Sequence, residues 1–111
     1  MKVNGRLTLG ENIADLGGVS IAFEALQRHL KRHPERRIIV DGFTPEQRFF
    51  LSWAQVWREN IRDDELKLRL TMDPHSPTRF RATIPAVNHA AFLAAFGMET
   101  HASGSGSLQV W

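Results

Sequence analysis

The sequence predicts a mainly α-helical chain, and three observations lead to that fold class. Apolar residues recur at helical spacing between positions 19 and 32, the four residues Thr44-Pro45-Glu46-Gln47 have the composition of a helix start, and an apolar face near the end of the chain is followed by Gly97. At 111 residues with 42% hydrophobic content, the chain could form one compact unit, and nothing suggests two.

The first helix is expected to begin near Leu9 or Gly10 and to reach the pair Gly17-Gly18. Each glycine inside a helix costs roughly 1 kcal/mol relative to alanine, so we expect close packing or a bend at this pair. The apolar pattern then resumes and predicts an amphipathic helix over about 19–32.

A stronger helix signal follows a connection of uncertain shape at 36–42. Thr44 has the character of an N-cap, Pro45 suits the first helical position, and Gln47 completes a capping box, so a helix begins here. Its body at 48–58 carries apolar side chains on nearly every side. That pattern is typical of a helix buried within a larger assembly.

The stretch 63–70 allows two interpretations. Its polar and apolar residues alternate as in a strand, whereas its acidic start and straight-chain residues favour a helix, which is our prediction. Beyond it, Pro74 and Pro77 prevent regular structure and place His75 on a rigid loop. Such loops often carry positioned catalytic side chains, although a loop histidine can also be merely exposed.

The end of the chain is expected to contain a short extended segment, a helix and a tail. The extended segment covers 80–85, and the last helix has Asn88 as its N-cap and Gly97 as its stop. The small polar residues that follow predict a flexible tail over 98–109.

Two pairs of ionisable residues have a spacing that brings their side chains together on a helix. Glu11 and Asp15 are four residues apart; because stacked carboxylates repel, they either have a cation or proton donor between them or form a solvated edge. His29 and His33 are also four apart, but Leu30 stands where the HExxH helix of a zinc peptidase has its glutamate. We therefore favour a plain helix end over a metal pair there.

Charge and composition exclude several classes of partner. The 14 Lys and Arg residues nearly balance the 12 Asp and Glu residues, and no aromatic residues interleave with the basic cluster at 28–37, so no nucleic acid is expected. The absence of cysteine removes disulfides and thiolate metal sites but assigns no compartment. No apolar run approaches the ~20 residues of a membrane span.

Longer motifs carry a resemblance to a known family. The run at 3–18 reads VNGRLTLGENIADLGG, and it is similar to the third-ligand motif of the neprilysin-type, or M13, zinc metallopeptidases. The resemblance continues in the run at 41–50, in Ala54-Gln55-Val56-Trp57, in His75-Ser76-Pro77 followed by Phe80-Arg81, and in the terminal Trp111.

The resemblance implies roles for six residues. Glu11 would be the third protein ligand of a Zn²⁺ ion, and Asp15 would hydrogen-bond one of the histidine ligands, in keeping with the need of such histidines for an outer carboxylate. His75 would donate to the oxyanion of the tetrahedral intermediate. Arg81 would be a further catalytic residue that orients the site and helps to bind the substrate backbone. Two further residues would line the pocket for the side chain after the scissile bond, unless they are ordinary core: Val56 and Trp57.

The fold that the resemblance implies is the helical C-terminal part of a zincin-like metallopeptidase catalytic domain, spanning residues 1–111. The sequence contains no HExxH, the motif that supplies two zinc ligands and the general base, so we expect this chain alone to be inactive and to supply one ligand. The function expected of it is to be part of a zinc metalloendopeptidase that hydrolyses peptides.

Three further expectations follow. Met98 and Leu108 replace cysteines of animal relatives, and a Gly/Ser tract replaces a usual segment, which suggests a bacterial-type member. The alternative to a peptidase part is a non-catalytic helical interaction module derived from the same fold. In either case, the apolar circumference of the helix at 48–58 predicts that the isolated chain forms a homo-oligomer.

Overall fold

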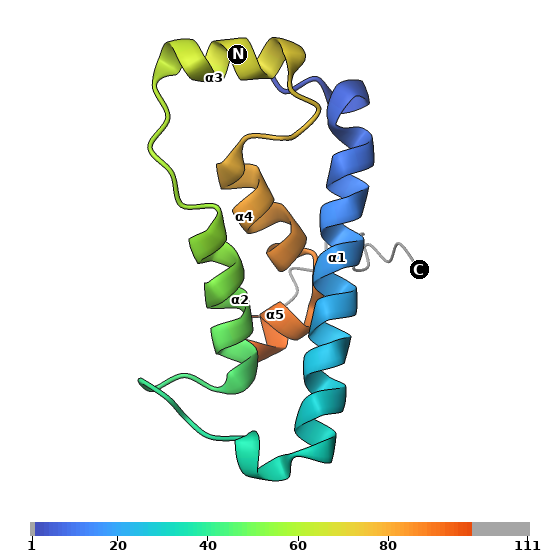
Figure 1. Ribbon diagram of the computed structural model, residues 1–111, viewed down its shortest axis with the longest axis vertical. Helices are drawn as coiled ribbons and strands as arrows, with labels where there is room; N and C mark the ends of the chain where they lie inside the picture. Colours follow the sequence, from blue (N-terminus) through green and yellow to red (C-terminus); the bar gives the residue numbers. More distant parts are fainter. Residues whose placement is uncertain (1, 99–111) are drawn as a thin grey trace.

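The computed structural model describes residues 2–98, and this part of the chain consists of five α-helices and a short 3₁₀ turn (Figure 1). The helices are α1 (Gly5–Arg32), α2 (Pro45–Val56), α3 (Asp63–Met72), α4 (Thr78–Val87) and α5 (Ala90–Ala95). The long helix α1 forms one side of the molecule, α2 forms the other, and α4 and α5 lie between them (Figure 1). The prediction of a mainly α-helical chain is confirmed.

The long helix α1 begins earlier than expected. Asn4 is its N-cap, and Asn4 Oδ1 accepts hydrogen bonds from the backbone N–H groups of Arg6 and Leu7 at 3.2 and 3.3 Å. Those bonds satisfy two of the free donors at a helix start, so the predicted start near Leu9 or Gly10 is wrong. The helix continues without a break through Gly17-Gly18, and the burial of Gly17 supports close packing over a bend at this pair.

The connection to α2 makes a tight turn. A 3₁₀ turn at Pro34–Arg36 is followed by a bridge between Val40 and Phe43, whose backbones exchange hydrogen bonds of 2.9 and 3.1 Å. The two residues between them, Asp41 and Gly42, have φ angles of 51° and 82°. Asp-Gly is a sequence that adopts this left-handed pair of conformations readily.

The start of α2 confirms the predicted capping box. Thr44 Oγ1 accepts from the backbone N–H of Gln47 at 3.1 Å, and Gln47 Oε1 accepts from the backbone N–H of Thr44 at 2.9 Å. One face of α2 is buried, with Phe50 at 2% exposure, while Val56 at its end is 72% exposed. Burial of the exposed side within a larger assembly stays a prediction.

The structure corrects the prediction for 80–85, because this segment lies within α4 and is not extended. Pro85 lacks the N–H that would bond to the carbonyl of Arg81 in a helix. That carbonyl instead accepts the indole N–H of Trp53 from α2 at 3.0 Å. The helix therefore tolerates Pro85, which is itself buried. The prediction of a helix at 63–70 is confirmed by α3.

The last helix is short and has a different cap from the one expected. Asn88 ends α4, and His89 caps α5 by accepting the backbone N–H of Ala91 at Nδ1, 3.2 Å away. Gly97 follows α5 with a φ of 61°, as expected for a glycine stop. The predicted flexible tail lies, from residue 99 on, outside the described residues.

A small aromatic core holds α1, α2, α4 and α5 together. Its buried members are Val19, Phe50 and Ala86, and the side chains packed around them include Phe23 and Phe92. Phe23 and Phe92 contact the Phe50 ring with centroid distances of 5.4 and 5.3 Å. This core fixes the position of α4 against α1, and α4 carries Arg81. No helix within residues 2–98 is long and apolar enough to cross a membrane.

Candidate functional site

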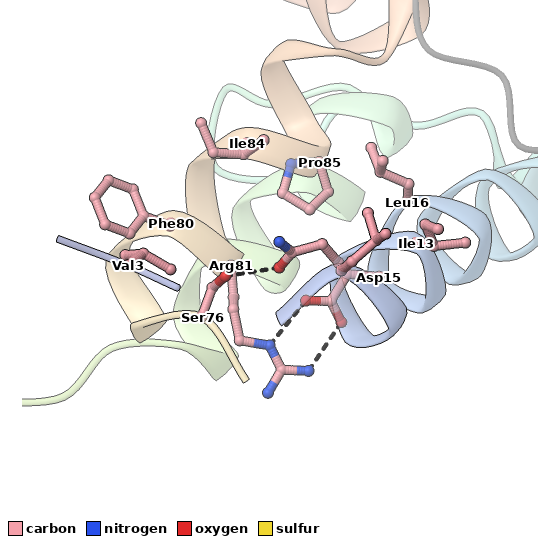
Figure 2. Close-up of a pocket in the computed structure, with 11 residues that line it drawn as sticks. Val3, Ile13, Asp15, Leu16, Ser76, Phe80, Arg81, Ile84 and Pro85 are labelled. Carbon is pink, nitrogen blue, oxygen red and sulfur yellow. Dashed lines mark hydrogen bonds and ion pairs between the residues drawn. The ribbon is translucent and has the colours of Figure 1, made fainter. Parts of the chain in front are cut away.

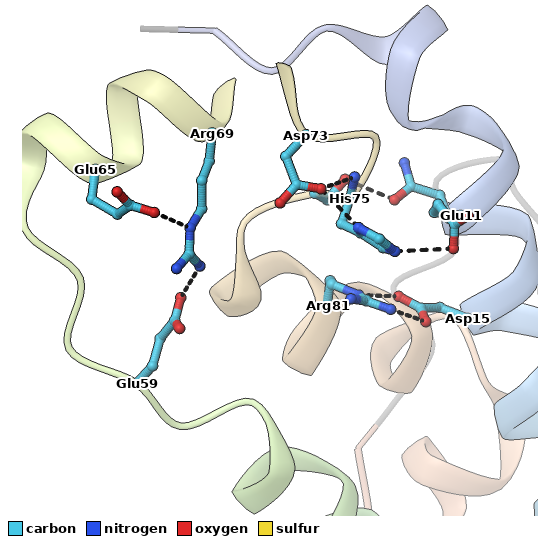
Figure 3. Close-up of polar contacts among 10 residues, drawn as sticks. Glu11, Asp15, Glu59, Glu65, Arg69, Asp73, His75 and Arg81 are labelled. Carbon is cyan, nitrogen blue, oxygen red and sulfur yellow. Dashed lines mark hydrogen bonds and ion pairs between the residues drawn. The ribbon is translucent and has the colours of Figure 1, made fainter. Parts of the chain in front are cut away.

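The N-terminal half of α1 meets the loop before α4, and this contact brings Glu11 and His75 together. His75 Nε2 lies 3.3 Å from Glu11 Oε2 (Figure 3). The other ring nitrogen, Nδ1, lies 2.7 Å from Asp73 Oδ1, and the same oxygen accepts the backbone N–H of His75 at 2.8 Å. The imidazole is thus held between two carboxylates, and its side chain is 41% exposed.

Asp73 is a site residue that sequence reasoning missed. The hydrogen bonds from the backbone N–H and the ring of His75 hold the pKa of the Asp73 carboxyl below its usual value, so it stays ionised beside the imidazole. The carboxylate therefore fixes the ring orientation. The spacing Asp73-Pro74-His75 was a usable signal, since an aspartate commonly accepts a bond from the backbone two residues further on.

Arg81 and Asp15 form a second, better buried pair next to the first. Arg81 Nε donates to Asp15 Oδ2 at 2.8 Å and Arg81 Nη2 donates to Asp15 Oδ1 at 2.9 Å, across 66 positions of sequence (Figure 3). The side chains are only 16% and 10% exposed. The bond to Asp15 raises the pKa of the Arg81 guanidinium, which is therefore always charged. A bidentate pair of this kind fixes the direction of both side chains.

A smaller polar contact attaches the loop to α1. The buried Ser76 donates from Oγ to Asn12 Oδ1 at 2.7 Å, and Asn12 Nδ2 donates to Thr8 Oγ1 at 3.3 Å. Sequence reasoning did not single out Ser76 or Asn12 for the site. Because Asn12 and Ser76 are the neighbours of Glu11 and His75 in sequence, this bond sets how closely the latter two approach.

Of the two residues expected to line a substrate pocket, one joins this cluster and one does not. The guanidinium of Arg81 lies over the Trp57 ring, 3.9 Å from its centroid. Within residues 2–98, Trp57 Nε1 is buried with no hydrogen-bond partner. Val56 lines another hollow, between α1 and α2, together with Leu26. The pocket role of both residues stays a prediction.

An apolar hollow of about 680 Å³ adjoins the cluster. Asp15 and Arg81 lie at its edge, with Ser76 (Figure 2). Its apolar walls come from α1 and α4, and they include Leu9, Ile13, Leu16, Phe80, Ile84 and Pro85. A hollow with apolar walls and a few converging polar groups is the usual form of a binding site.

The donor set of this part of the chain falls short of a complete metal site. A catalytic zinc has three protein ligands, whereas residues 2–98 contain no group of three or more His, Asp or Glu side chains that could hold a metal. The residues present therefore do not fit a zinc ion by themselves. Glu11 is 43% exposed, so its carboxylate is open to a partner group from outside the described residues.

The side chains of this cluster have three different chemical capacities. A positioned imidazole is able to donate a proton or a hydrogen bond, a fixed guanidinium is able to bind a carbonyl or carboxylate, and a half-exposed carboxylate is able to bind a cation. The fold and the cluster thus define a helical unit that places acid–base and ion-binding groups beside an apolar hollow.

Comparison with known proteins gives the family. The model of peptidase family M13 matches residues 1–105, and the chain belongs to this family, whose members are generally zinc metalloenzymes. An endothelin-converting enzyme homolog of Locusta migratoria is 45% identical over 96 residues, which cover 85% of this chain and 13% of the relative.

Two other relatives match the chain to a similar extent. Neprilysin-1 of Trittame loki is 40% identical over 103 residues, 87% of this chain and 14% of that protein. Endothelin-converting enzyme 1 of Bos taurus is 49% identical over 80 residues, 71% of this chain and 11% of that protein. The chain thus spans only about a seventh or less of these relatives. All three are animal proteins, so the expectation of a bacterial-type member is not supported.

Proposed function

We propose that this chain is part of a zinc metalloendopeptidase and supplies one zinc ligand, Glu11, and a transition-state-stabilising histidine, His75. The observation that carries the proposal is the meeting of two distant segments. The carboxylate of Glu11 and the imidazole of His75 lie 3.3 Å apart although 64 positions separate them. Membership in peptidase family M13 supports the same chemistry.

His75 is the group that would stabilise the oxyanion. Asp73 accepts from Nδ1 and so orients the ring with Nε2 toward Glu11. In its protonated form the ring carries a proton on each nitrogen, so when the Glu11 carboxylate is engaged by a cation, Nε2–H would donate to the substrate oxygen that becomes negative during attack on the peptide carbonyl. The Asp73 carboxylate stabilises the charge on the imidazole as it does so.

Arg81 would bind the substrate backbone. Nε and Nη2 are occupied by Asp15, which leaves Nη1 of the fork without a partner in the part of the chain that the structure describes. A carbonyl oxygen of the peptide is a suitable acceptor for it. The face of Arg81 rests on Trp57, so the guanidinium is held in one plane for that contact. The apolar hollow beside it would take a hydrophobic side chain of the peptide.

Zinc, when bound in the longer protein, would polarise the scissile carbonyl and lower the pKa of a water molecule. Glu11 would hold it together with ligands from outside the described residues. Asp15 would hold both Arg81 and a histidine ligand of the zinc. Its two oxygens accept from Arg81 and still have lone pairs that could accept from the histidine, the role that the family resemblance implies.

Metal retention in the longer peptidase tests this assignment. We expect Glu11→Gln to lose zinc, because an amide is a poor replacement for a carboxylate ligand, and Asp15→Ala to weaken zinc retention about 10 to 100-fold. Glu24→Gln, an exposed change on the same helix, is the matched control and should retain the metal. A Glu11→Gln protein that still binds one zinc ion tightly would contradict the proposal.

A further inference from the structure

A pair of histidines lies at the other end of α1, far along the helix from Glu11. His29 is in the last turn of the helix, and His33 is the C-terminal cap. Their ring centroids are 4.7 Å apart, and the ring planes are inclined by 34°. Both residues are exposed, and the His33 side chain has 50% of its surface open to solvent. The two rings thus lie next to each other on an exposed surface.

Glu35 orients one of the two rings. Its Oε1 lies 3.2 Å from His33 Nδ1. A neutral imidazole that donates from Nδ1 to a carboxylate has the lone pair of Nε2 free, and metal-binding histidines are usually held by such a contact. The backbone between the rings is also fixed, because the N–H of His33 donates to the carbonyl of His29 at 2.9 Å.

The surroundings determine which ion suits the pair. The C-terminal end of a helix is the negative end of its dipole and favours cations. Lys31 and Arg32 are nearby positive charges that oppose this effect, although at an exposed position their repulsion is screened by salt. An ion with a strong preference for imidazole nitrogen is therefore required. Among divalent ions Cu²⁺ has the highest affinity for nitrogen ligands, and Zn²⁺ ranks below it.

We propose that His29 and His33 form a two-imidazole binding site for Cu²⁺, and more weakly for Zn²⁺, with the His33 ring oriented by Glu35. Water completes the coordination, because Glu35 contacts the nitrogen of His33 that faces away from the ion, and residues 2–98 contain no group of three or more His, Asp or Glu side chains that could hold a metal. The spacing alone did not favour this site over a plain helix end. The ring approach and the contact from Glu35 are the observations that change the interpretation.

Titration of the 111-residue chain with Cu²⁺ tests the proposal, with electron paramagnetic resonance to count nitrogen ligands. We expect one site with two nitrogen donors. Loss of an outer contact costs about 10 to 100-fold in metal affinity, so Glu35→Ala should weaken binding about tenfold, and His29→Gln or His33→Gln should weaken it at least as much. The matched control, Glu24→Gln, is an exposed change on the same helix and should leave the Cu²⁺ affinity unchanged.

All variants are checked for helix content by circular dichroism; the exposed positions of His29 and His33 make loss of the fold unexpected. Unchanged Cu²⁺ affinity in the His29→Gln/His33→Gln double variant would overturn the proposal. A loss of binding in Glu11→Gln or His75→Gln would also overturn it, since copper would then occupy the other cluster. Full affinity in Glu35→Ala would overturn the orienting role of Glu35.

Discussion

The two ends of α4 lie in different surroundings. At the C-terminal end, Ala86 is 5% exposed and packs with Val19 and Phe50 in the aromatic core. At the N-terminal end, Arg81 contacts Asp15 through charged hydrogen bonds and lies over Trp57. Apolar burial has little directional preference, whereas a bidentate ion pair works only in one geometry. We infer that the core end supplies most of the stability and the site end sets the geometry.

The difference also explains how a short helix can carry a site residue. An isolated helix shorter than ~12–15 residues is only marginally stable in water, so α4, which has 10 residues, depends on tertiary packing. The core holds the last turn of α4, and the bond from Trp53 to the Arg81 carbonyl holds the middle. The guanidinium then reaches Asp15 from a backbone that is already in place.

The largest effect is expected at the core end. Phe50→Ala removes a ring that contacts Phe23, Phe49 and Phe92, and it should lower the free energy of unfolding by about 3–5 kcal/mol. Leu51→Ala, next to it on the exposed side of α2, should cost much less. Urea denaturation of both variants makes the comparison. Equal losses would mean that Phe50 is not at the centre of the stabilising core.

A smaller loss in the free energy of unfolding is expected at the N-terminal end of α4, where Arg81 pairs with Asp15. Asp15→Asn replaces the acceptor of two charged hydrogen bonds and should cost about 2 kcal/mol, the typical value for bonds to charged groups. A double-mutant cycle with Arg81→Met isolates the pair, and it should show coupling because both single changes remove the same contact. Additive losses would contradict the pairing of Asp15 with Arg81.

The pH dependence of stability also distinguishes the two ends of α4, because His89 lies just after the core end. Burial between Phe23 and Phe50 lowers the pKa of His89 below its usual value, and Nδ1 must be unprotonated to cap α5. Because the pKa of His89 is lower in the folded chain, the unfolded chain binds a proton at a higher pH than the folded chain does. The contribution of His89 to stability is thus present above about pH 6.5 and is lost as the pH falls through the folded-state value.

Thermal unfolding of the chain between pH 8 and pH 5 measures this contribution. His89→Asn is the matched variant, since asparagine can cap the helix without titrating in this range. It should reduce the fall in stability below about pH 6.5. The same fall in both proteins would show that another group is responsible.

Self-association should leave the folding of each chain nearly unchanged. Exposed apolar side chains occur both beside the hollow, where Ile84 is 46% exposed, and away from it, where Ile21 is 59% exposed. If the hollow is the contact, Ile84→Lys should restore a monomer and Ile21→Lys should not. Light scattering at micromolar concentration gives the mass. An unmodified chain that is a monodisperse monomer would contradict the predicted homo-oligomer.

Local signals predicted the parts of the fold that depend on neighbouring residues. The box formed by Thr44 and Gln47 is complete within four positions, so sequence sufficed for the start of α2. The failure at 80–85 has a distant cause. Pro85 indicates a break in a helix, and the donor that compensates for it, Trp53, comes from another helix 28 positions before Arg81. No pattern within the segment could have shown this.

The contacts of the candidate site also differ in how far apart their residues lie in the sequence. The contact of Asp73 with His75 spans two residues and was open to sequence reasoning, although it was missed. The pairing of Asp15 with Arg81 spans 66 positions, and spacing gives no information about it. Family resemblance pointed to both residues of that pair separately, and the fold gives the contact between them.

The most direct measurement concerns His75 in the longer peptidase. The account predicts that His75→Ala lowers kcat by about 100-fold or more, because one donor to the oxyanion is lost, while the bound zinc remains. Metal content and kcat for a peptide substrate should be measured on the same preparation, with Asp73→Asn expected to give a smaller loss of kcat. A His75→Ala enzyme with full kcat would contradict the central claim that the loop at 73–77 and α1 meet to form part of the catalytic site.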